Sequence, residues 1–540
     1  MKRFISGQTQ AYRFSVVLLS VWQLSTVAFA LDQSTGPQGS NVQAVWTAGT
    51  GYTGQGVAVG LISQDHVRTT HEAFDGHAHW YDATGQNTYL PSNHDTSVGG
   101  IICSRGGVEY PNHKGTAPDA ELFSVKVTDS DSVNTHWLED ALDYLVSQNC
   151  RVVVTGIQFP DSSVTPDGNS IWSLIYDYYA YRYNLVFATA AGNYESAVTV
   201  FGDTYNSITT GGLIGTSAGL YDKVGTGSNP GPTDDNRQKP EIAAPSQSQW
   251  VPVNGDAAWA NVGSTAGQTS WAVPHTGGVA AVLLDYADTT MDTNDNRSEV
   301  IKAVIVNSTF PNIVSKSGTA TTGLTWQADR GYGRIDALRA YEILSESPLS
   351  PGTNSAGQKG WTYQVIAKRN EVNTFRIYGL KNERFVLTIT WNREITKNIT
   401  GNYVEESSPK FNIDLSIRSP QGAVLFSETD TLNNLQKADI LLPEDGFYEV
   451  VLTNTTSKRN RGYGLAFELL PPLEADFNID YVVNDQDLAD FAFFWTDTGC
   501  LDSTQACFDY NLMLDDSINL ADFSVFANQW LSYDPRYYSP

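Results

Sequence analysis

Positive charge is scarce in this sequence, where 33 Lys and Arg stand against 59 Asp and Glu for a formal net charge of −26. Binding to a nucleic-acid backbone depends on clustered Lys and Arg, so the composition argues against a nucleic-acid partner. Long apolar runs are missing beyond the N-terminus, and we expect no transmembrane span in the mature chain. With 41% hydrophobic and 17% charged residues, the composition is typical of folded domains.

Cysteine is also scarce, with four in 540 residues, and their spacing is not that of a zinc site. Cys500 and Cys507 lie close together in one predicted loop, which favours a local disulfide in an oxidising compartment. Cys103 and Cys150 are far apart in the sequence. They are either paired or simply buried, and the sequence leaves both open.

The first 30 residues have the features of a secretory signal peptide. Basic residues precede an apolar run over residues 14–29, which ends in Ala28-Phe29-Ala30. A positive flank, a short apolar stretch and small residues at its end predict cleavage after Ala30 and a secreted or extracytoplasmic protein. An uncleaved membrane anchor is the alternative, although the run is short for a span.

Hydrophobic patterning divides the rest of the chain into different segments. Residues 31–53 form an N-terminal extension that is rich in Gly, Ser and Gln. Residues 54–345 then alternate strand-like runs, such as Val57 to Ile62, with helical spacing, as over residues 137–146. This alternation predicts an α/β domain whose parallel sheet has helices on both faces.

The pattern changes after a linker at residues 346–359. Apolar residues then alternate with polar ones, as in Phe385, Leu387 and Ile389, and turn signals separate the short runs. Several short strands of this kind predict an antiparallel β-sandwich over residues 360–470.

Residues 474–540 form a small acidic tail with an internal repeat of 35 residues. Leu488, Phe491, Ala492 and Trp495 recur as Phe523, Phe526, Ala527 and Trp530. Each set has the spacing of one apolar helix face, so the repeat predicts a pair of helices that bury these faces together.

Oxygen-bearing residues in the first half of this tail follow the spacing of an EF-hand loop. The candidate ligands are Asp476, Asn478, Asp480, Asn484 and Asp487, with the carbonyl group of Val482 between them. Such hard oxygen ligands predict a Ca²⁺ site. A second loop, residues 511–522, is a poorer match because Met513 occupies a ligand position. An acidic two-helix cap without metal is the alternative for either loop.

Six short segments within the α/β region carry further motifs, in a fixed order. They are Gly56 to Ile62 with Val67 to His71, His94 to Ile101, Lys114 to Pro118, Ala190 to Asn193, Thr269 to His275 and Gly331 to Ala337. Their order and content resemble the subtilases, the family of subtilisin-like serine peptidases. The resemblance covers roughly residues 54–343 and implies a subtilisin-like fold and peptide-bond hydrolysis without an organic cofactor.

The resemblance implies catalytic roles for three residues. A serine hydroxyl is a poor nucleophile at neutral pH, so Ser270 needs a base, and His94 stands where the family carries one. Asn193 is similar to the family's oxyanion asparagine, which donates its amide together with the backbone N–H of the serine. Residues 475–532 likewise resemble type I dockerin modules, which implies a cohesin-like or cell-surface partner for the tail.

The family's aspartate is missing from this pattern. Ser63, or Gln64 with one inserted residue, stands where it belongs, and Asp65 would reach the histidine only if the loop bends inward. In this family the carboxylate holds the histidine in the correct tautomer, and in subtilisin its loss alone costs about 10⁴-fold in rate. Asp65 is otherwise a solvated loop residue.

Other residues around the expected site also depart from the family. Asp95 and Ser97 replace a Gly and a His, and Gln268 replaces a Gly. Phe159 follows the strand that would pair with substrate and could block the cleft. Two functions therefore stay open. One is a secreted serine endopeptidase that cleaves protein or peptide substrates, and the other is an inactive pseudo-peptidase that binds a protein through the same cleft.

Overall fold

The structure is a computed structural model that describes most of the chain between residues 31 and 530. The described segments are 31–130, 132–157, 163–215, 220–311, 313–318, 320–321, 325–408, 410–470, 473, 475–477, 483–500, 507, 510–513 and 517–530. The expected signal peptide and Phe159 therefore lie outside the described residues. Within these segments, every helix is too short or too polar to cross a membrane.

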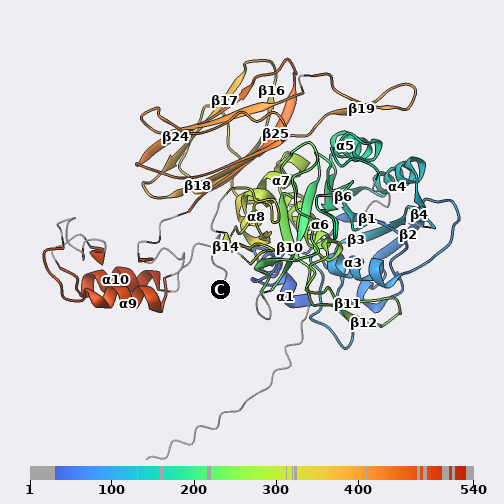
Figure 1. Cartoon of the computed structure of the whole chain (residues 1–540), viewed down its shortest axis with the longest axis horizontal. Helices are drawn as coiled ribbons and strands as arrows, with labels where there is room; N and C mark the ends of the chain where they lie inside the picture. The colour runs from blue at the N-terminus through green and yellow to red at the C-terminus, as the bar shows by residue number, and fades with distance from the viewer. Residues whose placement is uncertain are drawn as a thin grey trace, which may run out of the picture.

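The first domain is built on a mostly parallel sheet (Figure 1). In spatial order its strands are β14 (Ala320–Thr321), β13 (Ile313–Val314), β9 (Lys223–Val224), β8 (Ile208–Ile214), β7 (Val186–Ala190), β6 (Cys150–Thr155), β1 (Ala58–Ser63), β3 (Glu121–Lys126) and β2 (Ala78–Asp82), with β10 (Ile242–Pro245) beside β8. The pairs from β8 to β2 are all parallel. This confirms the α/β prediction.

Helices cover both faces of this sheet. On one face lie α3 (Asn93–Cys103), α6 (Val273–Ala287), α7 (Ser298–Asn307) and α8 (Ala337–Leu344), and on the other α4 (Thr135–Ser147) and α5 (Ile171–Tyr183). Successive strand residues point to opposite faces. Val152 and Val154 accordingly join the core beneath α6, whereas Val153 between them joins the core beneath α4 and α5.

Helix α6 is buried along nearly its whole length. Two glycines allow its close packing, because a Cβ atom on Gly277 would lie 2.2 Å from Val154 and one on Gly278 would lie 2.5 Å from Thr116. The short helix η2 (Thr269–Trp271) leads directly into α6. The N-terminus of this buried helix therefore places Ser270 rigidly relative to the sheet.

The segment expected as an N-terminal extension is an integral part of this domain. It forms α1 (Leu31–Thr35) and α2 (Gln43–Trp46). Leu31 is buried against Ile101 of α3 and Val251, and the Trp46 indole N–H donates to the carbonyl group of Thr116 at 3.1 Å. The remaining short elements are η1 (Glu72–Phe74), the pair β4 (Thr128–Asp129) and β5 (Ser132–Val133), and the hairpin β11 (Gln249–Pro252) and β12 (Trp259–Val262).

Two further sheets share one core and form the predicted sandwich (Figure 1). One sheet contains β15 (Asn354–Ser355), β17 (Val372–Gly379), β24 (Gly446–Asn454), β21 (Ile413–Arg418) and β22 (Val424–Glu428). The other contains β16 (Lys359–Ile366), β25 (Arg461–Leu470), β18 (Arg384–Thr390) and β23 (Leu435–Leu441), and a separate hairpin pairs β19 (Ile395–Lys397) with β20 (Tyr403–Glu405). Apart from the parallel pair β15 and β17, these pairings are antiparallel, as expected. Strand β15 lies within the segment expected as a linker.

The sandwich packs closely on α7. A Cβ atom on Gly464 of β25 would lie 2.4 Å from the carbonyl oxygen of Glu299, so a larger residue there would push the helix away. The Thr390 hydroxyl donates to the same carbonyl oxygen at 2.7 Å. A buried ion pair between Arg339 of α8 and Glu468 of β25 adds a second link. These contacts fix the sandwich against the α/β domain.

The described part of the tail contains two helices, α9 (Asp485–Phe493) and α10 (Leu520–Gln529). Their repeated apolar faces meet, with the rings of Phe491 and Phe526 stacked 5.4 Å apart, as the sequence repeat predicts. Cys500 and Cys507 form the expected disulfide. Cys103 and Cys150 are both unpaired and buried, which settles the alternative that the sequence left open.

Candidate active site

The folded chain brings Ser270 and His94 to the same end of the α/β domain. Ser270 lies in η2, with 7% of its surface exposed, and His94 lies in the first turn of α3. The His94 ring is 5.0 Å from the ring of Trp271, the residue after the serine. Within the described residues no hydrogen bond joins His94 to Ser270. Such bonds are often long before a substrate binds, so the arrangement fits a nucleophile and its base.

Asn193 is tied to the residue that precedes the serine. Its side-chain oxygen accepts hydrogen bonds from the Thr269 backbone N–H at 2.7 Å and the Thr269 hydroxyl at 3.1 Å. The oxygen end of the amide is thereby fixed, which orients the NH₂ end as a donor. Gly192 has a φ of +101°, and a Cβ atom there would lie 2.4 Å from the Thr199 hydroxyl oxygen. This turn therefore requires glycine to present Asn193.

Ser63 is placed at the end of β1 but does not take over the role of the missing aspartate. Its side chain is buried, with 1% exposure. The hydroxyl lies 3.0 Å from the carbonyl oxygen of Asp65 and 3.3 Å from that of Val125, both of which act as acceptors. These bonds fasten the loop after β1, and neither of them reaches the histidine. The structural role of Ser63 explains why a small hydroxyl suits this position.

The carboxylate beside His94 belongs to Asp95, the next residue in the chain. Its Oδ1 lies 3.0 Å from His94 Nδ1, and its side chain is 3% exposed whereas that of His94 is 38% exposed. The other oxygen, Oδ2, accepts the Asp65 backbone N–H at 2.8 Å and lies 3.1 Å from the Ser92 hydroxyl. Asp65 thus contributes its backbone N–H to the hydrogen bonds that hold the Asp95 carboxylate.

This geometry corrects the interpretation of Asp95 from the sequence, where it is only a departure from the family's glycine. Two features of the sequence together could have indicated this role for Asp95: an acidic residue directly after the histidine, and the missing aspartate on β1. Of the other departures, Ser97 is buried and donates its hydroxyl to the Pro252 carbonyl group at 3.0 Å. Gln268 is half-buried immediately before η2, and Phe159 lies outside the described residues.

The tail loop is described only in part. Asn478, Asp480 and Val482 lie outside the described residues. Asp487 is buried, and its two oxygens accept the backbone N–H groups of Phe477 at 2.8 Å and Asn484 at 2.9 Å. A carboxylate that accepts two such bonds keeps further lone pairs for a cation. In the part of the chain that the structure describes, no three acidic, His or Cys residues cluster as a metal site.

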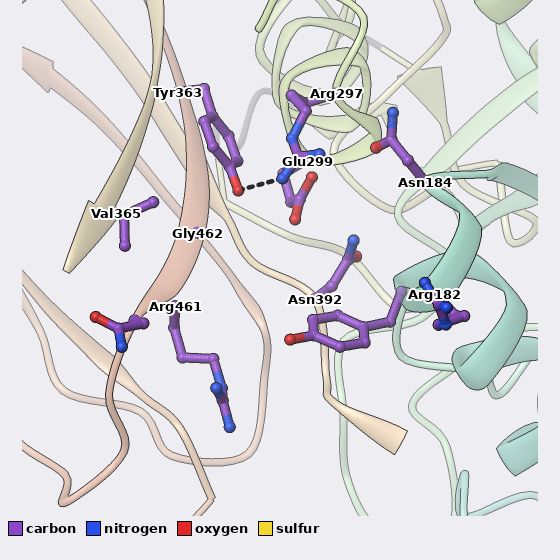
Figure 2. A pocket seen from close by; sticks show the side chains of 11 residues that line it. Arg182, Asn184, Arg297, Glu299, Tyr363, Val365, Asn392, Arg461 and Gly462 are labelled. Atoms are coloured by element: carbon purple, nitrogen blue, oxygen red, sulfur yellow. Dashed lines mark hydrogen bonds between the residues drawn. The ribbon is translucent and has the colours of Figure 1, made fainter. Parts of the chain in front are cut away.

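A polar cavity of about 270 Å³ lies where the sandwich meets the α/β domain. Figure 2 shows Arg297 and Tyr363 facing each other in it, with the Arg297 guanidinium donating to the Tyr363 hydroxyl at 2.6 Å. Glu299 also lines the cavity, and burial raises the pKa of its carboxyl group. None of Ser270, His94 and Asn193 lines this cavity, so it is separate from the candidate active site.

Several known proteins resemble the α/β part of this chain. The model of the Subtilase family matches residues 54–335, just over half of the chain. Pyrolysin from Pyrococcus furiosus is 22% identical over 322 residues, which cover 50% of this chain and 22% of pyrolysin. The human membrane-bound transcription factor site-1 protease is 26% identical over 315 residues, which cover 56% of this chain and 27% of that protein. The matched part is therefore only a fraction of each relative.

Two solved structures are also similar. The prenylagaramide maturation protease PagA aligns with a TM-score of 0.45 and 19% identity, over 56% of this chain and 99% of that one. A cold adapted subtilisin-like serine proteinase aligns with a TM-score of 0.33 and 22% identity, over 44% of this chain and 77% of that one.

Proposed function

This chain belongs to the subtilase family, and from that premise we propose that it is a secreted serine endopeptidase that hydrolyses peptide bonds in proteins. The observation that carries the proposal is the arrangement at the N-terminus of α6. Ser270 lies in η2, which leads into that helix; Thr269 before it binds Asn193, and His94 lies against Trp271. The candidate nucleophile, base and amide donor therefore all lie at or beside η2.

The proposed reaction follows from these positions. Ser270 Oγ attacks the peptide carbonyl carbon while His94 Nε2 takes its proton. The oxyanion that forms accepts hydrogen bonds from the Asn193 amide and the Ser270 backbone N–H, and the positive end of α6 adds to its stabilisation. The C–N bond then breaks as His94 returns the proton to the leaving amine. Water, deprotonated by His94, finally attacks the acyl carbon; the bond from that carbon to Ser270 Oγ breaks, and His94 returns the proton to Oγ.

Labelling with a fluorophosphonate probe tests this proposal, because an activated serine displaces fluoride from the probe's phosphorus. The full exported chain should be labelled in the presence of Ca²⁺, and Ser270→Ala should abolish the label while leaving the fold intact. A folded wild-type protein that takes no label would refute the peptidase function. It would favour the second candidate, a pseudo-peptidase that binds a peptide in the same cleft.

We further propose that the tail binds Ca²⁺ and docks the protein onto a cohesin-like or cell-surface partner. The ligand spacing of residues 476–487 supports the first part, together with the fixed carboxylate of Asp487. Exposed aromatic residues on the helices support the second, since Phe493 is 80% exposed. Calorimetric titration of the full chain with Ca²⁺ tests the site, with Asp476→Ala as the variant that should lose it.

We also propose that the protein is secreted or extracytoplasmic, because its N-terminal pattern is that of a signal peptide. Mass spectrometry of the exported chain tests it directly. We expect a mature N-terminus at Leu31, whereas an intact Met1 would favour the uncleaved anchor.

A further inference from the structure

The carboxylate of Asp95 does not act as an ordinary helix cap. Asp95 is the third residue of α3, and in a capping box its carboxylate would accept the backbone N–H of the N-cap residue Ser92. Here that N–H donates instead to the carbonyl group of His66 at 3.0 Å. In α9, by contrast, Asn484 and Asp487 form the complete box. The Asp95 carboxylate therefore does not complete a capping box, and one of its oxygens faces His94 instead.

Every hydrogen bond around this carboxylate has a defined direction. The Ser92 hydroxyl accepts the Asp95 backbone N–H at 3.0 Å, so its own proton is available to Oδ2. The Asp65 backbone N–H is also directed at Oδ2. Only Oδ1 faces the ring, and a carboxylate oxygen can only accept. His94 must then carry its proton on Nδ1, which leaves Nε2 unprotonated.

We infer that Asp95 is the positioning residue of this site and replaces, from the histidine's own helix, the carboxylate that the family carries on β1. The inference rests on the proposed function of His94 as the base. An unprotonated Nε2 is what a base needs to accept the serine proton, and the buried carboxylate then stabilises the imidazolium that forms. Ser63 is free to fasten the loop because its position no longer has to hold a charge.

Asp95→Asn is the decisive variant because it changes the direction of one bond and little else. Two donors, the Asp65 N–H and the Ser92 hydroxyl, converge on the position of Oδ2. The oxygen of the introduced amide should occupy that position, which turns its NH₂ group towards His94 Nδ1. Nδ1 must then accept, and the proton moves to Nε2, where it prevents the ring from acting as a base.

The test has a kinetic and a spectroscopic arm. Asp95→Asn should slow fluorophosphonate labelling by about 10⁴-fold, the effect of the corresponding change in a serine protease of another fold. ¹⁵N NMR of the full chain with labelled histidine, assigned with His94→Gln, should show Nδ1–H in the wild type and Nε2–H in Asp95→Asn. A lost structural contact alone would not move this proton between the two nitrogens.

Asp65→Asn distinguishes the role of the Asp65 carboxylate from that of the Asp95 carboxylate, because it keeps the backbone N–H that binds Asp95. We expect its labelling rate to fall by less than about 10-fold. A loss as large as that of Asp95→Asn would overturn the assignment, as would an unchanged His94 tautomer in Asp95→Asn. If the wild type takes no label, the proposed function fails, whereas the tautomer measurement still supports or overturns the role of Asp95.

Discussion

Replacing Ser63 with aspartate would restore the residue expected of the family, yet we predict that it damages this protein. The Ser63 hydroxyl acts as a donor to the carbonyl oxygens of Asp65 and Val125, in a position with 1% exposure. A carboxylate there would face two acceptors, with the Ser124 hydroxyl, 3.4 Å from Ser63 Oγ, as a nearby donor. A buried charge without a partner is destabilising.

The size of the effect has a ceiling because the new carboxyl group can take up a proton. If it stays protonated in the folded state at pH 7, and its pKa in the unfolded state is about 3.9, the cost is about 4 kcal/mol. A protonated carboxyl group can donate to one carbonyl oxygen and so keeps a bond that the Ser63 hydroxyl already makes in the wild type. We therefore expect Ser63→Asp to lower the free energy of unfolding by up to about 4 kcal/mol at pH 7.

The sign of the pH dependence follows from the raised pKa of this group in the folded state. The unfolded chain loses the proton first, so the penalty grows as the pH rises above about 4 and is small below it. Urea unfolding at about pH 7 and pH 5 measures this, with Ser63→Asn as the neutral control of the same shape. A Ser63→Asp protein that has wild-type stability and labels at least about 10-fold faster would refute the reasoning. It would show that a carboxylate on β1 can orient His94.

Three further predictions concern other parts of the molecule. Asn193→Ala should lower the labelling rate by about 10²–10³-fold without unfolding the protein, because it removes one oxyanion donor. Burial lowers the pKa of His275 to about 3. Between about pH 6.5 and pH 3 the unfolded chain therefore binds a proton that the folded chain does not, and the free energy of unfolding falls as the pH drops. His275→Gln should flatten this part of the pH profile measured by urea unfolding. Arg393→Met should destabilise the protein by about 3 kcal/mol in the same assay, because it leaves the buried carboxylate of Asp177, 3.4 Å from the guanidinium, without this cation.

Much of the fold could be predicted because it depends on local patterns. The apolar strands are buried on both faces of the parallel sheet. Successive side chains, such as those of Val152 and Val153, point to opposite faces and so join the hydrophobic cores on either side. The repeat in the tail likewise predicts two helices whose apolar faces meet at Phe491 and Phe526. The packing of residues 31–53 onto the domain does not follow from their composition, because a few apolar residues such as Leu31 are enough to anchor a short segment.

The sequence by itself predicts the residues of the candidate active site, because the order of six motifs singles out Ser270, His94 and Asn193 without any coordinates. Only the tertiary structure decided which carboxylate serves His94. Adjacent residues on a helix normally point in different directions, so no spacing rule pairs His94 with Asp95. Their contact exists because the loop after β1 brings the backbone N–H of Asp65 over the first turn of α3 and holds the second carboxylate oxygen there.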